Sequence, residues 1–356
     1  MASQARAVRQ PVDIRRLETY IRQHAAYIKT PIELKQFCFG QSNPTYQLTG
    51  SDGQRYVLRK RPPGKIISAT AHRIDREFRV ISALAKTDVP VPRAYLLCED
   101  ESIVGTSFYI MEFLDGRIFD DADIKGVAPD ERREMWKSAV TTLARLHRVD
   151  YKTVGLQGFG KEESFYDRQI ETITRISARQ AATISQAQSI PANVGEIPHF
   201  HETMKLFRDR SCQPTDRATI VHGDFKINNL VFHKTEPRVI GILDWEMATV
   251  GHPLSDLTNL LTPYVPTTVN LGPNGFSPAF AIGATPGLPS REQNLELYHL
   301  HWAIAFGMLR RAFIRQDIAA RAATGQASSA QAAEYGKLMV PLGLLAHELI
   351  EARMNE

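Results

Sequence analysis

The hydrophobic positions near the start of the chain change from a helical to a strand-like periodicity. Within Val12–Tyr27, apolar residues recur at the three- and four-residue spacing of an amphipathic helix. Beyond this segment, apolar and polar residues alternate, as they do in half-buried strands. The apolar face of the helix comprises Ile14, Leu17, Ile21 and Ala25, and the first three predicted strands are Leu34–Phe39, Tyr46–Thr49 and Arg55–Arg61.

A hairpin, a helix and a fourth strand complete this N-terminal pattern. Asp52-Gly53 lies between the second and third predicted strands and is a hairpin signal, because glycine readily adopts a positive φ. Ala71–Lys86 is predicted to be a helix, Val89–Pro92 an extended link, and Ser107–Phe113 a strand. The segment 1–115 is therefore predicted to be a domain built on a small sheet, with a leader helix.

The remainder, 116–356, is predicted to be a second and mainly helical domain. Two short apolar runs interrupt the helical pattern, at Asn229–His233 and Val239–Leu243. The fold class predicted for the whole chain is α+β. The predicted helices are Glu131–His147, Phe165–Gln180, Glu196–Arg208 and Arg291–Arg315, and the small, polar segment Ala320–Ala333 is predicted to be a loop or a helix end.

Composition excludes several classes of protein. The 356 residues carry a net charge of +4, without a basic run long enough to follow a nucleic acid. No apolar stretch reaches the length of a membrane span. The three cysteines, Cys38, Cys98 and Cys212, lie far apart with no CxxC spacing, so a disulfide framework or a zinc knuckle is not expected. We therefore expect a cytoplasmic protein that binds neither membranes nor nucleic acid.

The most informative polar residues flank the two apolar runs of the second domain. Asp224, Lys226 and Asn229 follow the apolar residues Ile220-Val221, and Asp244 follows the next apolar run. Phosphoryl transfer needs a carboxylate to accept the proton of a hydroxyl, oxygen ligands for Mg²⁺, and a cation at the γ-phosphate. Asp224 suits the first role, Asn229 and Asp244 the second, and Lys226 the third. The alternative is a polar turn between two strands, with Asp224 as a capping residue.

These residues resemble the catalytic and metal-binding motifs of the aminoglycoside phosphotransferase and choline kinase superfamily. The matching segments are His222-Gly223-Asp224 with Asn229, and Leu243-Asp244-Trp245-Glu246. The resemblance implies a bilobal protein-kinase-like fold, with a small antiparallel sheet in the N-terminal lobe and a mainly helical C-terminal lobe. It also implies ATP and Mg²⁺ as cofactors. His222, Glu246 and Asp256 would then support the catalytic loop, although a helix N-cap is the alternative for Asp256.

The same resemblance assigns ATP-binding roles in the N-terminal lobe. Phe39–Tyr46 is similar to the family's phosphate loop, with Ser42 and Asn43 near the phosphates; a plain hairpin turn is the alternative. Only one of Arg59 and Lys60 can face the cleft, because side chains alternate along a strand. The family pattern favours Arg59. Glu77 would pair with that cation, and Glu112-Phe113 would form the hinge that binds adenine.

The acceptor is the open question. Within the superfamily the chain resembles the kinase-like domain joined to some acyl-CoA dehydrogenases, which implies a hydroxyacyl-CoA substrate. The sequence ends at Glu356 without a dehydrogenase module, so the expected partner is a separate acyl-CoA dehydrogenase that acts downstream. Thr262–Pro289 contains no charged residue, which suits an acyl group near Tyr264, Phe276 and Phe280 better than a polycation. The alternatives are a kinase for an aminoglycoside or amino alcohol, and a nucleotide-binding pseudokinase or regulatory module.

Overall fold

A computed structural model of the protein divides it into two compact units, each built from several segments. It describes residues 12–37, 43–62, 73–185, 192–265, 278–281, 283–290, 301–324 and 332–354. The first unit comprises Met1–Ile124, Glu134–Phe159 and His222–Thr249. The second unit comprises Lys125–Arg133, Gly160–Val221 and Val250–Glu356. The domain boundary after Asp115 stays a prediction.

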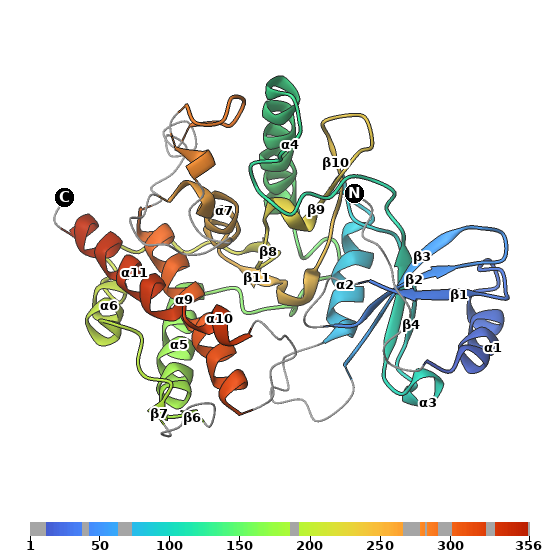
Figure 1. The fold of residues 1–356 in the computed structure, drawn as a ribbon, viewed down its shortest axis with the longest axis horizontal. Coiled ribbons are helices and arrows are strands. Elements are labelled where there is room, and N and C mark those ends of the chain that lie inside the picture. The colour runs from blue at the N-terminus through green and yellow to red at the C-terminus, as the bar shows by residue number, and fades with distance from the viewer. Residues whose placement is uncertain are drawn as a thin grey trace. The chain divides into compact units, whose positions relative to one another are not determined.

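The first unit is built on a five-stranded antiparallel sheet (Figure 1). Its strands lie in the order β1-β2-β3-β5-β4. Asp52 and Gly53 form the predicted turn between β2 and β3, where Gly53 has a φ of +79° and the Asp52 side chain accepts from the amide of Gln54. The strands are β1 (Glu33–Gln36), β2 (Thr45–Thr49), β3 (Arg55–Lys60), β4 (Ala94–Cys98) and β5 (Phe108–Glu112).

The two faces of this sheet have different partners. On one face, Leu58 and Ile110 are buried in a core with Leu17 and Ile21 of helix α1 (Ile14–His24). Helix α3 (Glu101–Val104) contributes Val104 to the same core. Helix α2 (Ile74–Leu84) packs against β4 and β5. Because side chains alternate along β3, Leu58 and Lys60 share the α1 side while Arg59 points to the opposite face.

A second group of elements in the first unit carries the candidate chemistry. Strands β9 (Leu230–Phe232) and β10 (Val239–Ile242) form an antiparallel hairpin. The short helices η1 (Ile227–Asn229) and η2 (Trp245–Met247) flank the open end of this hairpin. Helix α4 (Pro129–Arg148) continues from the second unit into the first.

The second unit is mainly helical. Its long helix α9 (His301–Ala323) packs against α5 (Phe165–Ala181), α7 (Leu254–Leu261), α10 (Ala332–Gly336) and α11 (Met339–Met354). Helix α6 (Phe200–Phe207) packs against α11. The remaining elements are the paired strands β8 (Thr219–Val221) and β11 (Thr249–Gly251), the pair β6 (Ile184–Ser185) and β7 (Ala192–Asn193), and the turns η3 (Thr262–Tyr264) and η4 (Pro278–Phe280).

The α+β class and the small antiparallel sheet are confirmed, whereas several elements depart from the prediction. Helix α9 does not end at Arg315 but continues to Ala323, because the alanines there favour helix. Helix α11 was not predicted, since its apolar residues surround the helix and leave no polar stripe. Within the described segments, no helix has the length and apolar character needed to cross a membrane. The missed elements of the first unit are β4 and α3.

Candidate active site

The loop from His222 to Asn229 presents polar side chains outward because its apolar side chains point inward. Phe225 and Ile227 are almost fully buried, whereas Asp224 and Lys226 are partly exposed. This alternation places Asp224 and Lys226 on the same side of the loop. The Lys226 ammonium lies 2.9 Å from a carboxylate oxygen of Asp224. The predicted base and the predicted phosphate-binding cation are therefore neighbours in space.

His222 anchors this loop to the strand end that carries Asp244. Its ring is fully buried, and Nδ1 accepts a hydrogen bond from the amide of Asp224 at 3.2 Å. Because Nδ1 accepts, the proton is on Nε2, which lies 2.9 Å from the carbonyl oxygen of Leu243 and donates to it. The ring also packs edge-on against Trp245, with 4.6 Å between centroids. These contacts fit the predicted bracing role.

Asn229 and Asp244 lie at the same end of the β9–β10 hairpin. The amide of Leu243 donates to the carbonyl of Asn229 at 2.8 Å, which aligns the two strand ends. The Asn229 side-chain nitrogen donates to the backbone oxygen of Asp224 at 2.9 Å and to its carboxylate at 3.2 Å. Because the nitrogen end of the amide is directed at Asp224, the opposite, oxygen end is the one that suits a cation.

Asp244 adopts a left-handed backbone conformation, with a φ of +67°. This conformation is uncommon outside glycine, and aspartate tolerates it better than most residues. The buried Trp245 that follows donates from its indole nitrogen to the carbonyl of Ile242 at 2.9 Å. That bond closes a tight turn after β10. The turn directs the Asp244 side chain to Arg59, whose guanidinium lies 2.6 Å from the carboxylate.

Arg59, rather than Lys60, faces this cluster. Its guanidinium lies 3.2 Å from Glu77, as the family pattern implies. It also lies 3.5 Å from Glu246. Lys60 donates to the carbonyl of Val104 at 3.0 Å, on the α1 side of the sheet.

Two further side chains complete the surroundings of Glu77. The Asn43 amide donates to Glu77 at 2.8 Å and to Glu246 at 3.4 Å. The hydroxyl of Tyr109, the cross-strand partner of Arg59, donates to Glu77 at 3.0 Å. Tyr109 was not predicted as a site residue, because an aromatic residue inside a strand is an ordinary core signal.

Burial and charge have opposing effects in this cluster. Burial raises the pKa of Glu77, although the Arg59 charge works against that shift. For Asp244, burial also favours the neutral form, but the Arg59 charge and its hydrogen bond outweigh it and lower the pKa. Burial disfavours the charge on Arg59, yet Glu77 and Asp244 raise its pKa well above the ordinary value. One permanently charged guanidinium thus faces three carboxyl groups.

The donor atoms fit a divalent cation. Asp244 and Glu246 supply carboxylate oxygens and Asn229 an amide oxygen, the hard ligands that Mg²⁺ takes together with water and phosphate. Three carboxyl groups around one guanidinium also leave negative charge for a cation to neutralise. No group of three or more His, Cys, Asp or Glu residues in the described ranges forms an all-protein metal cage. A metal shared with a phosphate ligand suits this set better than a structural metal.

The predicted hinge is tightly packed on the β9–β10 hairpin. A Cβ atom at Gly116 would lie 2.3 Å from the carbonyl oxygen of Phe232, so only glycine fits there. Next to it, Arg117 and Phe232 exchange two backbone hydrogen bonds, at 2.7 and 2.8 Å. The amide of Glu112 donates to the carbonyl of Arg93 at 2.8 Å. The N–H of Glu112 is therefore already used within the protein. Phe113 lies under the guanidinium of Arg55, 4.1 Å from it.

The structure does not test the roles predicted for two further residues, Ser42 and Asp256. Ser42 falls outside the described residues. Asp256 is fully buried in the first turn of α7, in the second unit. It is not the N-cap, because Pro253 occupies that position. Its support of the catalytic loop stays a prediction.

Two aromatic residues of the uncharged segment Thr262–Pro289, which was expected to receive an acyl chain, pack against each other. Tyr264 and Phe280 are both buried and pack edge-to-face, with 4.6 Å between ring centroids. These two rings already have apolar partners, so an acyl chain would gain little from them. Phe276 lies outside the described residues.

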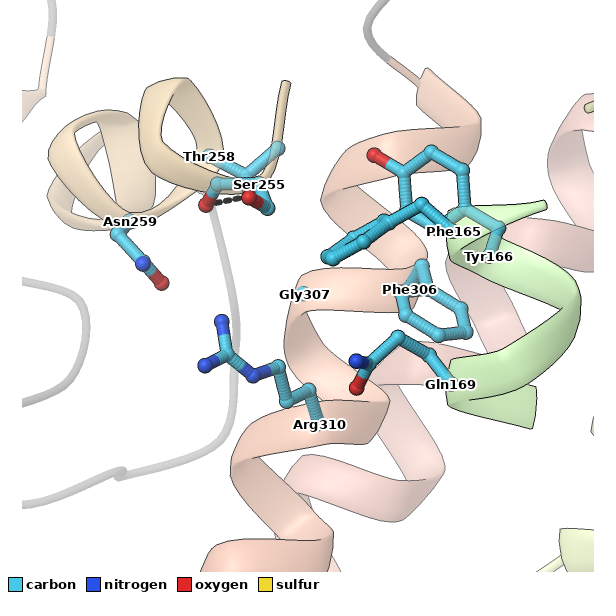
Figure 2. A pocket seen from close by; sticks show the side chains of 9 residues that line it. All are labelled: Phe165, Tyr166, Gln169, Ser255, Thr258, Asn259, Phe306, Gly307 and Arg310. Carbon is cyan, nitrogen blue, oxygen red and sulfur yellow. Dashed lines mark hydrogen bonds between the residues drawn. The ribbon is translucent and has the colours of Figure 1, made fainter. Parts of the chain in front are cut away.

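The second unit has a small pocket elsewhere, among α5, α7 and α9. Its cavity volume is about 10 Å³, roughly the room that one water molecule needs. Figure 2 shows the Arg310 guanidinium and the Asn259 amide approaching each other from α9 and α7, with the rings of Phe165 and Phe306 on the other side. The described residues that line it include one arginine and no carboxylate. The complete set is Phe165, Tyr166, Gln169, Ser255, Thr258, Asn259, Phe306, Gly307 and Arg310.

Comparison with known protein families matches residues 33–290 to the phosphotransferase enzyme family. The chain belongs to this family. The match includes every predicted site residue, from Ser42 to Asp256. It confirms the superfamily resemblance that rests on His222-Gly223-Asp224 and Leu243-Asp244-Trp245-Glu246.

The relatives of this phosphotransferase include acyl-CoA dehydrogenase family members and proteins named as aminoglycoside phosphotransferases. Acyl-CoA dehydrogenase family member 11 of Gallus gallus is 36% identical over 330 residues, which cover 89% of this chain and 40% of that protein. The chain thus spans less than half the length of this relative. A crystal structure from Ralstonia eutropha JMP134, of a protein provisionally named an aminoglycoside phosphotransferase, is 35% identical. Its TM-score is 0.78, with 96% of this chain and 99% of that chain covered.

A more distant solved structure shares the fold alone. The ternary complex of APH(2'')-IIa with streptomycin and ATP has a TM-score of 0.56 at 16% identity, with 87% of this chain and 90% of that chain covered. Together these similarities confirm the predicted α+β kinase-like fold.

The strand register predicts different outcomes for two neighbouring cations. Arg59→Met should raise the KM for ATP by about tenfold or more. The variant loses the charge-assisted hydrogen bonds that Arg59 would make to phosphate, and it loses the ion pair with Glu77. Lys60→Met, which removes a cation of the opposite sheet face, should change that KM by less than about twofold. Steady-state kinetics of both variants would test this. A larger KM effect for Lys60→Met would show that the register does not govern nucleotide binding.

Asp244 should also contribute to the pH dependence of stability. Its pKa is lower in the folded state than its ordinary value, so its ionised form stabilises the fold near neutral pH. That contribution is lost as the pH falls through the folded-state pKa. The melting temperature of the wild type should therefore decline more steeply between about pH 5 and pH 3 than that of Asp244→Asn, and the two should converge in acid. Parallel curves would contradict the assigned role of Arg59.

Proposed function

We propose that this phosphotransferase is an ATP-dependent kinase that phosphorylates a hydroxyl group of a small metabolite. The observation that carries the proposal is the loop anchored by His222. It brings the Asp224 carboxylate, the Lys226 ammonium and the Asn229 amide together at the hairpin end that also carries Asp244. A carboxylate base, a cation and two oxygen ligands are the parts that phosphoryl transfer needs.

Each side chain has a distinct task in this reaction. Asp224 holds the acceptor hydroxyl and takes its proton as the oxygen forms a bond to the γ-phosphorus. The bond between that phosphorus and the β–γ bridging oxygen breaks, and ADP leaves. Lys226 moves from Asp224 to the transferring group, where negative charge collects. Arg59, held by Glu77, contacts phosphate oxygens with its planar fork.

Mg²⁺ would be held by Asp244 and Asn229, with Glu246 nearby. When bound, it neutralises phosphate charge and orients the nucleotide. The ion pair between Arg59 and Asp244 would then loosen or rearrange, because one carboxylate would serve both cations. Without nucleotide and metal, the Arg59 guanidinium would thus neutralise Asp244 in place of the metal ion.

Catalysis accounts for these residues better than nucleotide binding alone. A regulatory module needs Arg59 and the metal ligands, but it has no need for a base beside a mobile cation. Asp224 is partly exposed, so an acceptor hydroxyl can reach its carboxylate when Lys226 turns from it to a phosphate. We therefore favour an active enzyme over a pseudokinase.

For the acceptor we propose a hydroxyacyl-CoA. The similarity to acyl-CoA dehydrogenase family member 11 favours it, because a phosphorylated hydroxyl is a good leaving group for elimination on an acyl chain. The product would then pass to an acyl-CoA dehydrogenase.

An aminoglycoside is the competing acceptor. It is suggested by the provisional name of the Ralstonia eutropha protein, which is 35% identical. Aminoglycosides carry several ammonium groups, and each loses hydration on binding unless a carboxylate replaces it. The uncharged segment Thr262–Pro289 and the pocket with Arg310 offer little of that compensation. Electrostatics therefore favours the thioester.

Lys226 should act mainly on the chemical step. Lys226→Ala is expected to lower kcat by about 100-fold while the KM for ATP changes little, because the contact strengthens only as charge develops on the transferring group. Rapid-mix measurement of a single turnover would separate chemistry from product release. An unchanged kcat would show that Lys226 remains in solvent throughout the reaction.

The acceptor is tested by a direct comparison of substrates. Turnover of 3- and 4-hydroxyacyl-CoAs of increasing chain length should be efficient, while kanamycin, choline and the matching unsubstituted acyl-CoAs should give only background ATP hydrolysis. Asp224→Asn is the matched control, since it keeps the size of the base but cannot take the proton. It should bind ATP normally and lose phosphoryl transfer.

Two outcomes would redirect the proposal. Efficient turnover of kanamycin with none of the thioesters would establish the competing acceptor and leave the kinase intact. Normal ATP binding with no transfer to any acceptor, and no difference between the wild type and Asp224→Asn, would favour the regulatory module.

A further inference from the structure

We infer that Arg76 is a positioning residue for nucleotide binding, which acts by holding helix α2 so that Glu77 stays against Arg59. The inference rests on the proposed function, because it assumes that the Arg59–Glu77 pair serves ATP. It concerns contacts on another side of α2 from those that Glu77 makes. All the residues involved belong to the first unit.

Arg76 joins α2 to two segments that are distant in sequence. Its guanidinium donates to the carbonyl of Phe159 at 2.6 Å and to the carbonyl of Ala248 at 3.4 Å. The same group lies 4.0 Å from the centroid of the Phe159 ring, at cation–π distance. Phe159 is almost fully buried, so it provides a fixed base for this contact.

The geometry of α2 separates the two sets of contacts. Residues 76 and 77 are adjacent, and side chains one position apart on a helix differ by about 100° in direction. Glu77 therefore points to the sheet while Arg76 points to the loop that precedes Phe159. Arg79, three positions further along the same side, donates to the carbonyls of Gly155 and Gln157 at 3.0 and 3.1 Å.

The acceptors of Arg76 and Arg79 are all backbone carbonyls. A carboxylate partner would neutralise charge in many orientations, whereas a carbonyl in a turn accepts only from a limited direction. Gly155 and Gly158 have φ values of +80° and +70°, which produces the tight turns that expose these carbonyls. These directional contacts therefore fix the position of α2, which neutralisation of its charge alone would not do.

The contact to Ala248 connects α2 to the metal-binding segment. Ala248 follows η2, which begins directly after Asp244 and contains Glu246. Helix α2 packs against η2. Arg76 thus fixes α2 relative to the backbone that carries Asp244 and Glu246, while Glu77 fixes it relative to Arg59. If the contacts of Arg76 are lost, Glu77 should no longer be aligned with Arg59.

Arg76 has a useful internal comparison. Arg73 lies at the start of the same helix, but it is exposed, and among the described residues its side chain bonds only to the nearby Asp75, at 2.8 and 2.6 Å. Removing Arg73 should change the charge of α2 without releasing it from Phe159 or Ala248. Arg76→Met, which keeps the length of the side chain, can therefore be compared with Arg73→Met.

The test measures nucleotide affinity in the full-length protein without any acceptor. Titration calorimetry with Mg·ATP should give a Kd about tenfold weaker for Arg76→Met, an intermediate Kd for Arg76→Lys and an unchanged Kd for Arg73→Met. The decisive measurement is a double-mutant cycle with Glu77→Gln. If Arg76 acts through Glu77, Arg76→Met should weaken ATP binding far less in the Glu77→Gln background than in the wild type.

Several results would overturn the inference. A lower melting temperature for Arg76→Met with unchanged ATP affinity would give Arg76 a role in stability alone. Equal effects of Arg76→Met in the wild-type and Glu77→Gln backgrounds would show that Arg76 does not act through Glu77. Failure of the wild type itself to bind Mg·ATP would refute the proposed function. In that case hydrogen exchange could still test whether Arg76 holds α2. Faster exchange of the α2 amides in Arg76→Met than in Arg73→Met would show that it does.

Discussion

The site depends on one buried cation. The Arg59 guanidinium lies 3.2 Å from Glu77 and 2.6 Å from Asp244, so it joins the sheet, α2 and the segment after β10. A guanidinium cannot lose its charge at ordinary pH, so it must be matched by carboxylates wherever it is buried. Glu77 is held in turn by Asn43 and Tyr109. The three parts of the cluster consequently have to assemble together or not at all.

The catalytic loop depends on a neutral histidine rather than on ion pairs. His222 accepts from the amide of Asp224 and donates to the carbonyl of Leu243, and both bonds require the same tautomer. The His222 ring thereby sets the distance between the loop that carries Asp224 and the strand end that carries Asp244. Asn229 adds a second connection through its amide nitrogen. The loop is thus fixed by hydrogen bonds, while Asp224 and Lys226 are partly exposed and pair with each other.

Much of this arrangement could be predicted from the sequence because the signals were local. Alternation along Arg55–Arg61 predicts the strand, and the motif residues Asp224, Asn229 and Asp244 predict the loop and the candidate metal ligands. The register of Arg59 against Lys60 needed the sheet, since the alternation alone allows either face. Tyr109 and Arg76 were not predicted at all. Their partners lie 32 and more residues away, and neither residue belongs to a recognisable motif.

The discontinuity of the first unit has a consequence for synthesis on the ribosome. The sheet and α2 emerge first, with Arg59 and Glu77 already able to meet, whereas His222–Thr249 appears more than a hundred residues later. Until then the β9–β10 hairpin cannot exchange its bonds with Arg117, and the cluster lacks Asp244 and Glu246. Contacts of such long range form late in folding. A nascent chain would therefore carry half of this charged cluster, with an incompletely matched cation, while more than a hundred further residues are added.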